Sequence, residues 1–225
     1  MSLRRPIVLF LVLLALVLVG LAGLLAARDT GTAVDARVAS PAALAQARAD
    51  ALAGVAARLY YEETYGSPNS AAVRLVSRLP GLIAGLETGD VRRAVRALNS
   101  IVVDHIVRDR ITRGRRTLID DGLPFVISGQ RHPLRAPDGT YLGRIEVSIQ
   151  DVIGLIKLFH RFTGAEIVVR GTAGHAKSSL PALDLLPLPS TGPFSLAGRT
   201  YYVSSFSRVG FAGEPLRLWI LGPAR

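Results

Sequence analysis

The sequence predicts an α+β protein with an N-terminal transmembrane helix, then further helices, then an antiparallel sheet with one inserted helix. Three features predict this order. Residues 6–27, close to the N-terminus, are 22 uncharged and mostly apolar residues. Apolar residues then recur at helical spacing up to about residue 104, and from residue 105 onward they alternate with polar residues. The 225 residues suffice for one domain of ordinary size with an appendage.

The apolar run, residues 6–27, is predicted to be a membrane anchor, because at about 1.5 Å per residue it spans a hydrocarbon core of roughly 30 Å. Arg4 and Arg5 precede it, so the positive-inside rule places residues 1–5 in the cytoplasm and residues 28–225 outside. The alternative is a cleaved signal peptide, whose apolar region usually runs only about 7–15 residues. Both readings predict an extracytoplasmic domain in a bacterial envelope, and the anchor makes it a single-pass membrane protein.

Composition excludes several classes of site. The chain has 27 Lys plus Arg residues, 17 Asp plus Glu residues and no cysteine. Without cysteine there is no disulfide framework, thiolate zinc site or cysteine nucleophile. The densest arginine cluster, residues 108–116, is interleaved with Asp109 and followed by two more aspartates, so we expect a solvated, salt-bridged hairpin there and no nucleic-acid partner.

A linker over residues 28–40 leads into the helical part of the outer domain, residues 41–104. Ser40 and Pro41 predict the N-cap and first residue of a long helix that ends near Tyr65. The apolar stripe of this helix is predicted to contain Leu44, Leu52, Val55 and Leu59.

Two shorter helices are predicted after it. Gly66 and Pro68 mark the start of the first, which ends near Pro80 because proline interrupts helices. After a glycine-rich joint, Asp90 is expected to cap the second.

The sheet part of the outer domain is predicted over residues 105–225. Its predicted strands are residues 106–113, 116–119, 133–135, 140–150, 165–170, 199–208 and 216–221. Asp151 caps the inserted helix and Gly164 closes it. Residues 171–193 contain four prolines and are predicted to be a long loop.

Alternation along residues 140–150 predicts the two faces of that strand. Tyr141, Ile145 and Val147 are expected on one face, and Leu142 and Glu146 on the other.

The stretch DGTYLGRIEVSIQDVIGL, residues 138–155, resembles the turn, strand and capped helix of extracytoplasmic PAS-like sensor domains of the Cache, or PDC, group. Residues 105–121 are similar to the first strand pair of that group, and residues 201–205 to a late strand. The resemblance covers about residues 41–221. It implies a PAS-like sheet, a small-molecule ligand and a role in signal transduction.

Members of the group usually reach a kinase, cyclase or chemotaxis module through a second membrane helix. This chain ends at Arg225 and lacks the aromatic and acidic signature of amine-binding Cache domains. The resemblance therefore implies a stand-alone anchored domain that signals through a membrane partner.

Four residues are candidates for ligand binding in a PAS-like pocket. Arg108 and Arg110 share one strand face and suit a carboxylate or phosphate through bidentate hydrogen bonds. Tyr141 and Tyr201 are expected to line the same space. The alternative is that the tyrosines are packing residues and that the arginines pair with acidic neighbours, namely Asp109, Asp120 and Glu146.

The sequence contains no pattern for a catalytic or metal site. No two of the four histidines are spaced as metal ligands on one helix, and no G-x-S-x-G motif is present. We therefore predict no metal, no cofactor and no enzyme. The main hypothesis is a membrane-anchored Cache-like sensor domain, and the alternative is an envelope interaction or scaffold protein with no ligand pocket.

Overall fold

The structure is a computed structural model that describes residues 40–100, 106–172 and 174–224. The predicted cytoplasmic tail and the predicted anchor, residues 6–27, lie outside the described residues. Within the described residues, no helix is both long enough and apolar enough to cross a membrane.

Helices precede strands, which confirms the α+β class. The helices are α2 (Pro41–Tyr65), α3 (Ser67–Val76), α4 (Pro80–Thr88), α5 (Val91–Asn99) and α6 (Val152–Thr163). The strands before α6 are β1 (Arg108–Arg113), β2 (Arg116–Gly122), β3 (Gln130–Arg135) and β4 (Tyr141–Ser148). The strands after α6 are β5 (Glu166–Arg170), β6 (Ala176–Ser178), β7 (Thr191–Leu196), β8 (Arg199–Val209) and β9 (Pro215–Pro223). Two short 3-10 turns are η1 (Pro181–Leu183) and η2 (Phe211–Gly213).

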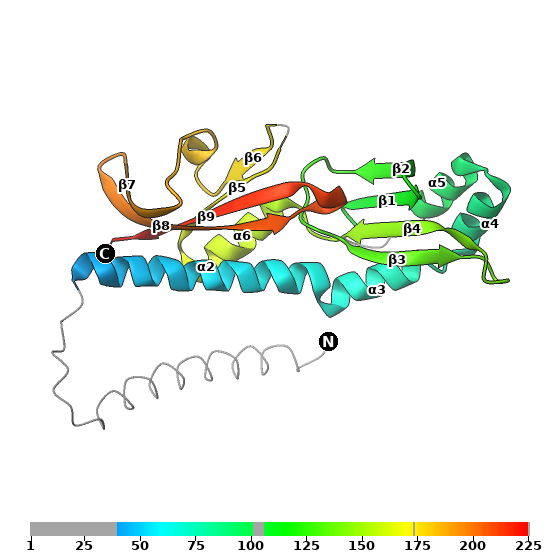
Figure 1. The fold of residues 1–225 in the computed structure, drawn as a ribbon, viewed down its shortest axis with the longest axis horizontal. Helices are drawn as coiled ribbons and strands as arrows, with labels where there is room; N and C mark the ends of the chain where they lie inside the picture. The colour runs from blue at the N-terminus through cyan, green and yellow to red at the C-terminus, as the bar shows by residue number, and fades with distance from the viewer. Residues whose placement is uncertain (1–39, 101–105, 173, 225) are drawn as a thin grey trace, which may run out of the picture. The chain divides into compact units, whose positions relative to one another are not determined.

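The strands form two antiparallel sheets, so the prediction of one sheet was wrong. The first sheet has the order β2-β1-β4-β3, and the second has the order β6-β5-β9-β8-β7 (Figure 1). Helix α6 is therefore a connection between sheets rather than an insertion into one. Its apolar face, which includes Leu155 and Phe159, packs on Ile167 and Leu218 of the second sheet.

The predicted helix caps are confirmed. Asp90 Oδ1 accepts a hydrogen bond from Arg93 N at 2.9 Å, and Asp151 Oδ1 accepts one from Gly154 N at 2.6 Å. Gly164 ends α6 with φ of 66°, a left-handed conformation that glycine adopts without steric cost.

Helix α2 packs along β8 and β9 of the second sheet, and α3 continues beside β3 and β4 of the first (Figure 1). The buried face of α2 consists mainly of alanines, and its members are Ala45, Ala49, Ala53, Ala56, Tyr60 and Thr64. Small side chains let the helix backbone approach the strands closely: a Cβ built on Gly222 of β9 would lie 3.7 Å from Ala49 Cα. The apolar stripe predicted for this helix was wrong at Leu44 and Val55, because these side chains are 51% and 40% exposed.

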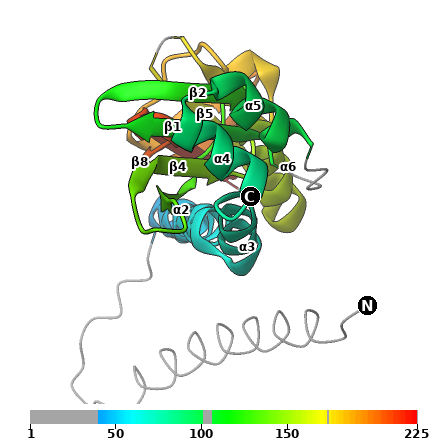
Figure 2. The same cartoon turned by 90° about the vertical axis from the view of Figure 1, so that its right-hand side faces the viewer.

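Helix α4 occupies the segment predicted to be a glycine-rich joint. Its glycines allow close packing against α5, since a Cβ on Gly81 would lie 2.9 Å from Ala97 Cβ and one on Gly85 would lie 2.7 Å from Ala94 N. Figure 2 shows α4 and α5 side by side at one end of the first sheet. The buried side chains of α3, α4 and α5 pack with Ile111 of β1 in one core.

Residues 171–193 are not one long loop, because they contain β6, η1 and the start of β7. Arg170 organises this segment by donating to the backbone oxygens of Leu183, Asp184 and Leu186. Leu183 is thereby held in the apolar layer on Trp219.

The predicted faces of β4 were wrong at its start. The pairing of β3 with β4 shifts register between Leu134 and Arg135, where Gly143 has φ of 149°. This irregularity turns Leu142 into the same core as Ile145 and leaves Tyr141 46% exposed.

One hydroxyl joins the two sheets. Tyr60 Oη donates to Val209 O at the end of β8, at 2.8 Å, and accepts from Ser128 N just before β3, at 3.1 Å. The segment that carries Ser128 lies close against β4, since a Cβ on Gly129 would lie only 2.5 Å from Val147 O. Helix α2 thus fixes the first sheet and the second sheet through the same side chain.

We predict that Tyr60→Phe destabilises the protein by about 1–3 kcal/mol, because the buried Ser128 N–H loses its acceptor. Tyr61→Phe is the matched control. Tyr61 is the next residue of the helix but is exposed, so this change is expected to alter stability by less than about 0.5 kcal/mol. Urea unfolding of both variants measures the difference, and equal stabilities would contradict the role of the hydroxyl.

Candidate functional site

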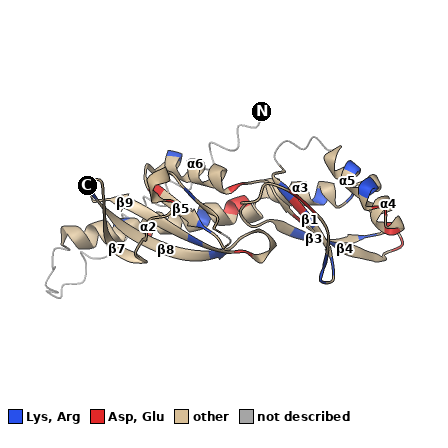
Figure 3. Ribbon diagram, turned by 90° about the horizontal axis from the view of Figure 1, so that it is seen from above, with Lys and Arg blue, Asp and Glu red and all other residues tan. Residues whose placement is uncertain are grey.

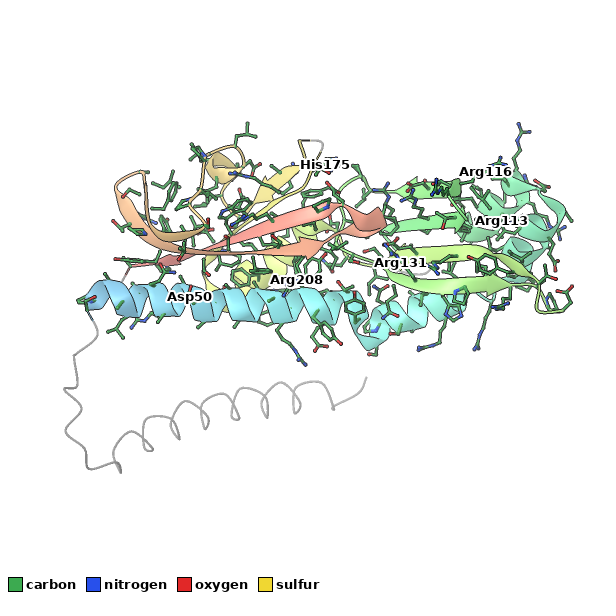
Figure 4. All side chains as sticks on the ribbon, in the orientation of Figure 1. Asp50, Arg113, Arg116, Arg131, His175 and Arg208 are labelled. Carbon is green, nitrogen blue, oxygen red and sulfur yellow. The ribbon has the colours of Figure 1, made fainter. Side chains whose placement is uncertain are left out.

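A groove of about 840 Å³ lies where α2, α3 and both sheets meet. We call it the tyrosine groove. The side chains that shape it are Tyr60, Tyr61 and Tyr65 of α2, Gln130 and Arg131 of β3, and Arg208 of β8. Figure 4 labels Arg131 and Arg208, which reach it from different sheets. A concave surface that joins aromatic side chains with a few polar groups is the usual form of a small-molecule site.

The polar groups of the tyrosine groove are positioned by neighbouring side chains. Gln130 Nε2 donates to Ser70 Oγ at 2.6 Å, which links β3 to α3. Arg131 Nε donates to Glu146 Oε2 at 3.1 Å. Among the described residues Arg208 forms no ion pair, and its guanidinium lies over the ring of Phe206 at 4.8 Å. Arg208 is therefore the cation best able to meet an anionic group.

The three tyrosines have different roles. Burial raises the pKa of Tyr60 to about 12, so its hydroxyl stays neutral and serves the joint between the sheets. The rings of Tyr61 and Tyr65 lie 5.0 Å apart and are 54% and 55% exposed, which leaves them open to a ligand. Burial also raises the pKa of Glu63, in the same turn of α2.

A second hollow, of about 210 Å³, lies on the open face of the first sheet. We call it the arginine hollow. Its charged side chains are Arg110, Arg115, Arg131, Arg144 and Glu146, and Ala212 of η2 closes one edge. Arg131 borders both hollows, so the ion pair between Arg131 and Glu146 lies between them.

The structure does not bring the four predicted ligand-binding residues together. Arg108 pairs with Asp120 at 2.9 Å and donates to the oxygen of Pro124, as the ion-pair alternative expected. Arg110 Nη2 donates to Thr117 Oγ1 at 2.9 Å, and its side chain lines the arginine hollow.

The two predicted tyrosines lie elsewhere. Tyr141 is exposed beside Arg135, whose guanidinium lies 6.0 Å from its ring centroid. Tyr201 lies in the second sheet, in the apolar layer that contains Trp219. Ligand binding by Arg108, Arg110, Tyr141 and Tyr201 stays a prediction.

Sequence reasoning missed the residues that shape the tyrosine groove. The only local signal was the group of tyrosines at the end of the first helix, at positions 60, 61 and 65. Arg131 and Arg208 carry no local signal, because they meet only after the two sheets have formed on α2.

Among the described residues, no three acidic or histidine side chains are placed to hold a metal ion. His160 Nδ1 lies 3.0 Å from Ala165 O and 3.5 Å from Glu166 Oε2, and His175 Nδ1 lies 3.2 Å from Glu214 Oε1. The first two contacts join α6 to the start of β5, and the third joins the segments just before β6 and β9.

The charged form of the Asp109 carboxyl group is disfavoured by its surroundings in the folded protein. Burial, together with the cross-strand neighbour Asp121 and then Asp120, raises the pKa of Asp109 to about 6. Its Oδ1 has no hydrogen-bond partner among the described residues. Because the folded-state pKa lies above the ordinary value of 3.8, the contribution of Asp109 to stability is full below about pH 4 and is lost as pH rises through about 6.

We predict that Asp109→Asn is more stable than the wild type at pH 8 by roughly 1–3 kcal/mol, and that the difference vanishes near pH 4. Glu87→Gln, on the exposed surface of α4, is the control and should show little difference at either pH. Urea unfolding at several pH values tests this. If Asp109→Asn is no more stable than the wild type at pH 8, the charged Asp109 carboxylate does not destabilise the folded protein.

No protein-family model and no curated protein sequence matches the chain. Among solved structures it is similar to the periplasmic domain of LuxQ from Vibrio cholerae, with 13% identity and a TM-score of 0.47 over 78% of this chain and 98% of that one. It is similar to the extracellular domain of vpHK1S-Z8, described as a histidine kinase, with 13% identity and a TM-score of 0.47 over 83% and 97% of the two chains. The ligand-binding domain of the Pseudomonas fluorescens chemoreceptor CtaA, in complex with L-alanine, has 7% identity and a TM-score of 0.41 over 79% and 96%.

Proposed function

We propose that the chain is a single-pass, membrane-anchored extracytoplasmic sensor domain. In this proposal residues 6–27 are the anchor, residues 41–225 form the outer domain, and the outer domain binds a small molecule without chemical conversion. A membrane partner protein reads whether the site is occupied. The observation that carries the proposal is the tyrosine groove, because its walls come from α2, α3 and both sheets.

The groove favours a small organic anion. Arg131 and Arg208 supply positive charge from opposite sheets, and guanidinium groups recognise carboxylates by paired hydrogen bonds. Tyr61 and Tyr65 supply exposed ring faces for an apolar or aromatic part of the same molecule. Organic acids and amino acids combine these two features.

Helix α2 offers a route from the groove to the anchor. Its C-terminal end carries Tyr60, Tyr61 and Tyr65, and its N-terminal end follows the predicted linker, residues 28–40, in the sequence. A ligand that binds more tightly to one position of α2 than to another would shift the population of those positions. The partner would read this shift at the membrane.

A second candidate is an envelope interaction or scaffold protein. Helix α2 exposes Leu44, Val55, Tyr61 and Tyr65 to solvent, and exposed apolar side chains on one helix suit a protein contact. In that case α2 would contact a protein partner directly, and the groove would hold no ligand.

We predict that organic acids or amino acids raise the unfolding temperature of the full chain in detergent, since a ligand that binds only the folded state stabilises it. Arg208→Ala should weaken binding by roughly tenfold, the effect of losing one charge-assisted hydrogen bond. Arg92→Ala, which removes the same charge from the exposed surface of α5, should bind like the wild type. If no organic acid, amino acid, amine or nucleotide stabilises the chain, the sensor proposal fails and the scaffold alternative remains.

The anchor and its orientation can be tested by thiol labelling, because the chain has no cysteine of its own. We predict that a membrane-impermeant thiol reagent labels Ala36→Cys in intact spheroplasts and labels Ser2→Cys only after lysis. Recovery from the cells of a chain that begins after residue 27 would instead identify a cleaved signal peptide. Labelling of both variants before lysis would contradict the predicted orientation.

A further inference from the structure

The arginine hollow contains more positive charge than its own acidic residue balances. Arg110 of β1, Glu146 of β4 and Arg131 of β3 lie in register across three adjacent strands. Arg144 lies two residues before Glu146 on β4, and Arg115 lies in the turn between β1 and β2. Figure 3 shows the basic residues of these strands in blue. Four guanidinium groups and one carboxylate give this hollow a formal charge of +3, from 4 − 1.

Most of these guanidinium groups lack a full set of acceptors. Among the described residues, Arg115 and Arg144 form no ion pair and donate no hydrogen bond to another side chain. Arg110 Nε is buried without a hydrogen-bond partner and lies 3.7 Å from Asp120 Oδ2. Buried N–H groups are nearly always paired, so Arg110 Nε lacks an acceptor that a bound anion could supply, and the exposed guanidinium groups of Arg115 and Arg144 are free to donate to the same anion.

The single carboxylate in the hollow is already occupied. Glu146 Oε2 accepts from Arg131 Nε at 3.1 Å, and Glu146 Oε1 accepts from Ala212 N at 3.2 Å. Its side chain is buried, so it cannot rotate to serve Arg110, Arg115 and Arg144 as well. The hollow therefore carries positive charge that Glu146 does not neutralise.

We propose that the arginine hollow binds one tetrahedral oxyanion, a phosphate or sulfate group. Guanidinium groups present paired donors that match two oxygens of such a group, and several of them surround a multiply charged anion better than a single carboxylate does. The volume of about 210 Å³ suits one such group with some of its water rather than a large organic molecule. This site shares Arg131 with the tyrosine groove, but the proposal does not depend on whether that groove binds a ligand.

The test is calorimetric titration of the full chain in an uncharged detergent with inorganic phosphate and with sulfate, at constant ionic strength against chloride. We expect both anions to bind. Arg144→Gln and Arg115→Ala should each weaken binding by roughly tenfold, because each removes a charge-assisted donor. Both side chains are exposed, so these variants should fold.

Two further variants separate a built site from general positive charge. Arg92→Ala removes one positive charge from α5 and should leave the affinity unchanged. Glu146→Gln removes the negative charge beside the anion and should tighten binding, an effect opposite in sign to that of Arg144→Gln. If neither anion binds better than chloride, or if Arg92→Ala weakens binding as much as Arg144→Gln, the proposal is overturned.

The source of the phosphate group is distinguished by a second probe. Glycerophosphoglycerol carries the phosphodiester of a lipid headgroup in soluble form. If it binds as tightly as inorganic phosphate and depends on Arg144 in the same way, the site accepts a phospholipid headgroup. If only the inorganic anions bind, the site takes a free oxyanion. Both results uphold the oxyanion site. If neither glycerophosphoglycerol nor the inorganic anions bind, the oxyanion site is contradicted.

Discussion

The structure depends on the close contact between α2 and strands β8 and β9 of the second sheet. Ala45, Ala49, Ala53 and Ala56 let the helix backbone approach β8 and β9, where larger side chains would hold it away. That distance brings the hydroxyl of Tyr60 within reach of β8 and of the segment before β3 at once. One helix face thus sets the position of both sheets.

The joint between the sheets also accounts for the two hollows. The tyrosine groove opens beside Tyr60 because α2 continues past the end of the second sheet before α3 begins. The arginine hollow is closed at one edge by η2, the turn between β8 and β9, whose Ala212 N–H reaches Glu146 of the first sheet. Because Arg131 borders both hollows, an anion in either one would act on the ion pair between Arg131 and Glu146. In both proposals, ligand binding would therefore act on side chains that also hold the two sheets in contact.

Local features of the fold could be predicted from the sequence, and long-range ones could not. Asp90 and Asp151 cap the starts of α5 and α6, and Gly164 ends α6, as predicted, because caps depend on residues within one turn. The division into two sheets depends on which strands pair, and alternation of residues gives no information about partners. Arg110 could be selected from the sequence as a candidate ligand-binding residue, because it shares a strand face with Arg108. Arg208 could not, since its place in the groove follows from the packing of β8 on α2.

Native-state hydrogen exchange tests the central claim most directly, that α2 holds the two sheets as one cooperative unit. The amides to compare are those of Ile145 and Val147 in β4 with those of Leu218 and Ile220 in β9, all fully buried. We predict a single free energy of opening for both pairs and for Ser128 N–H. If β4 opens at a clearly lower free energy than β9 and Ser128 N–H opens with β4 alone, the sheets are independent and α2 does not hold them as one unit.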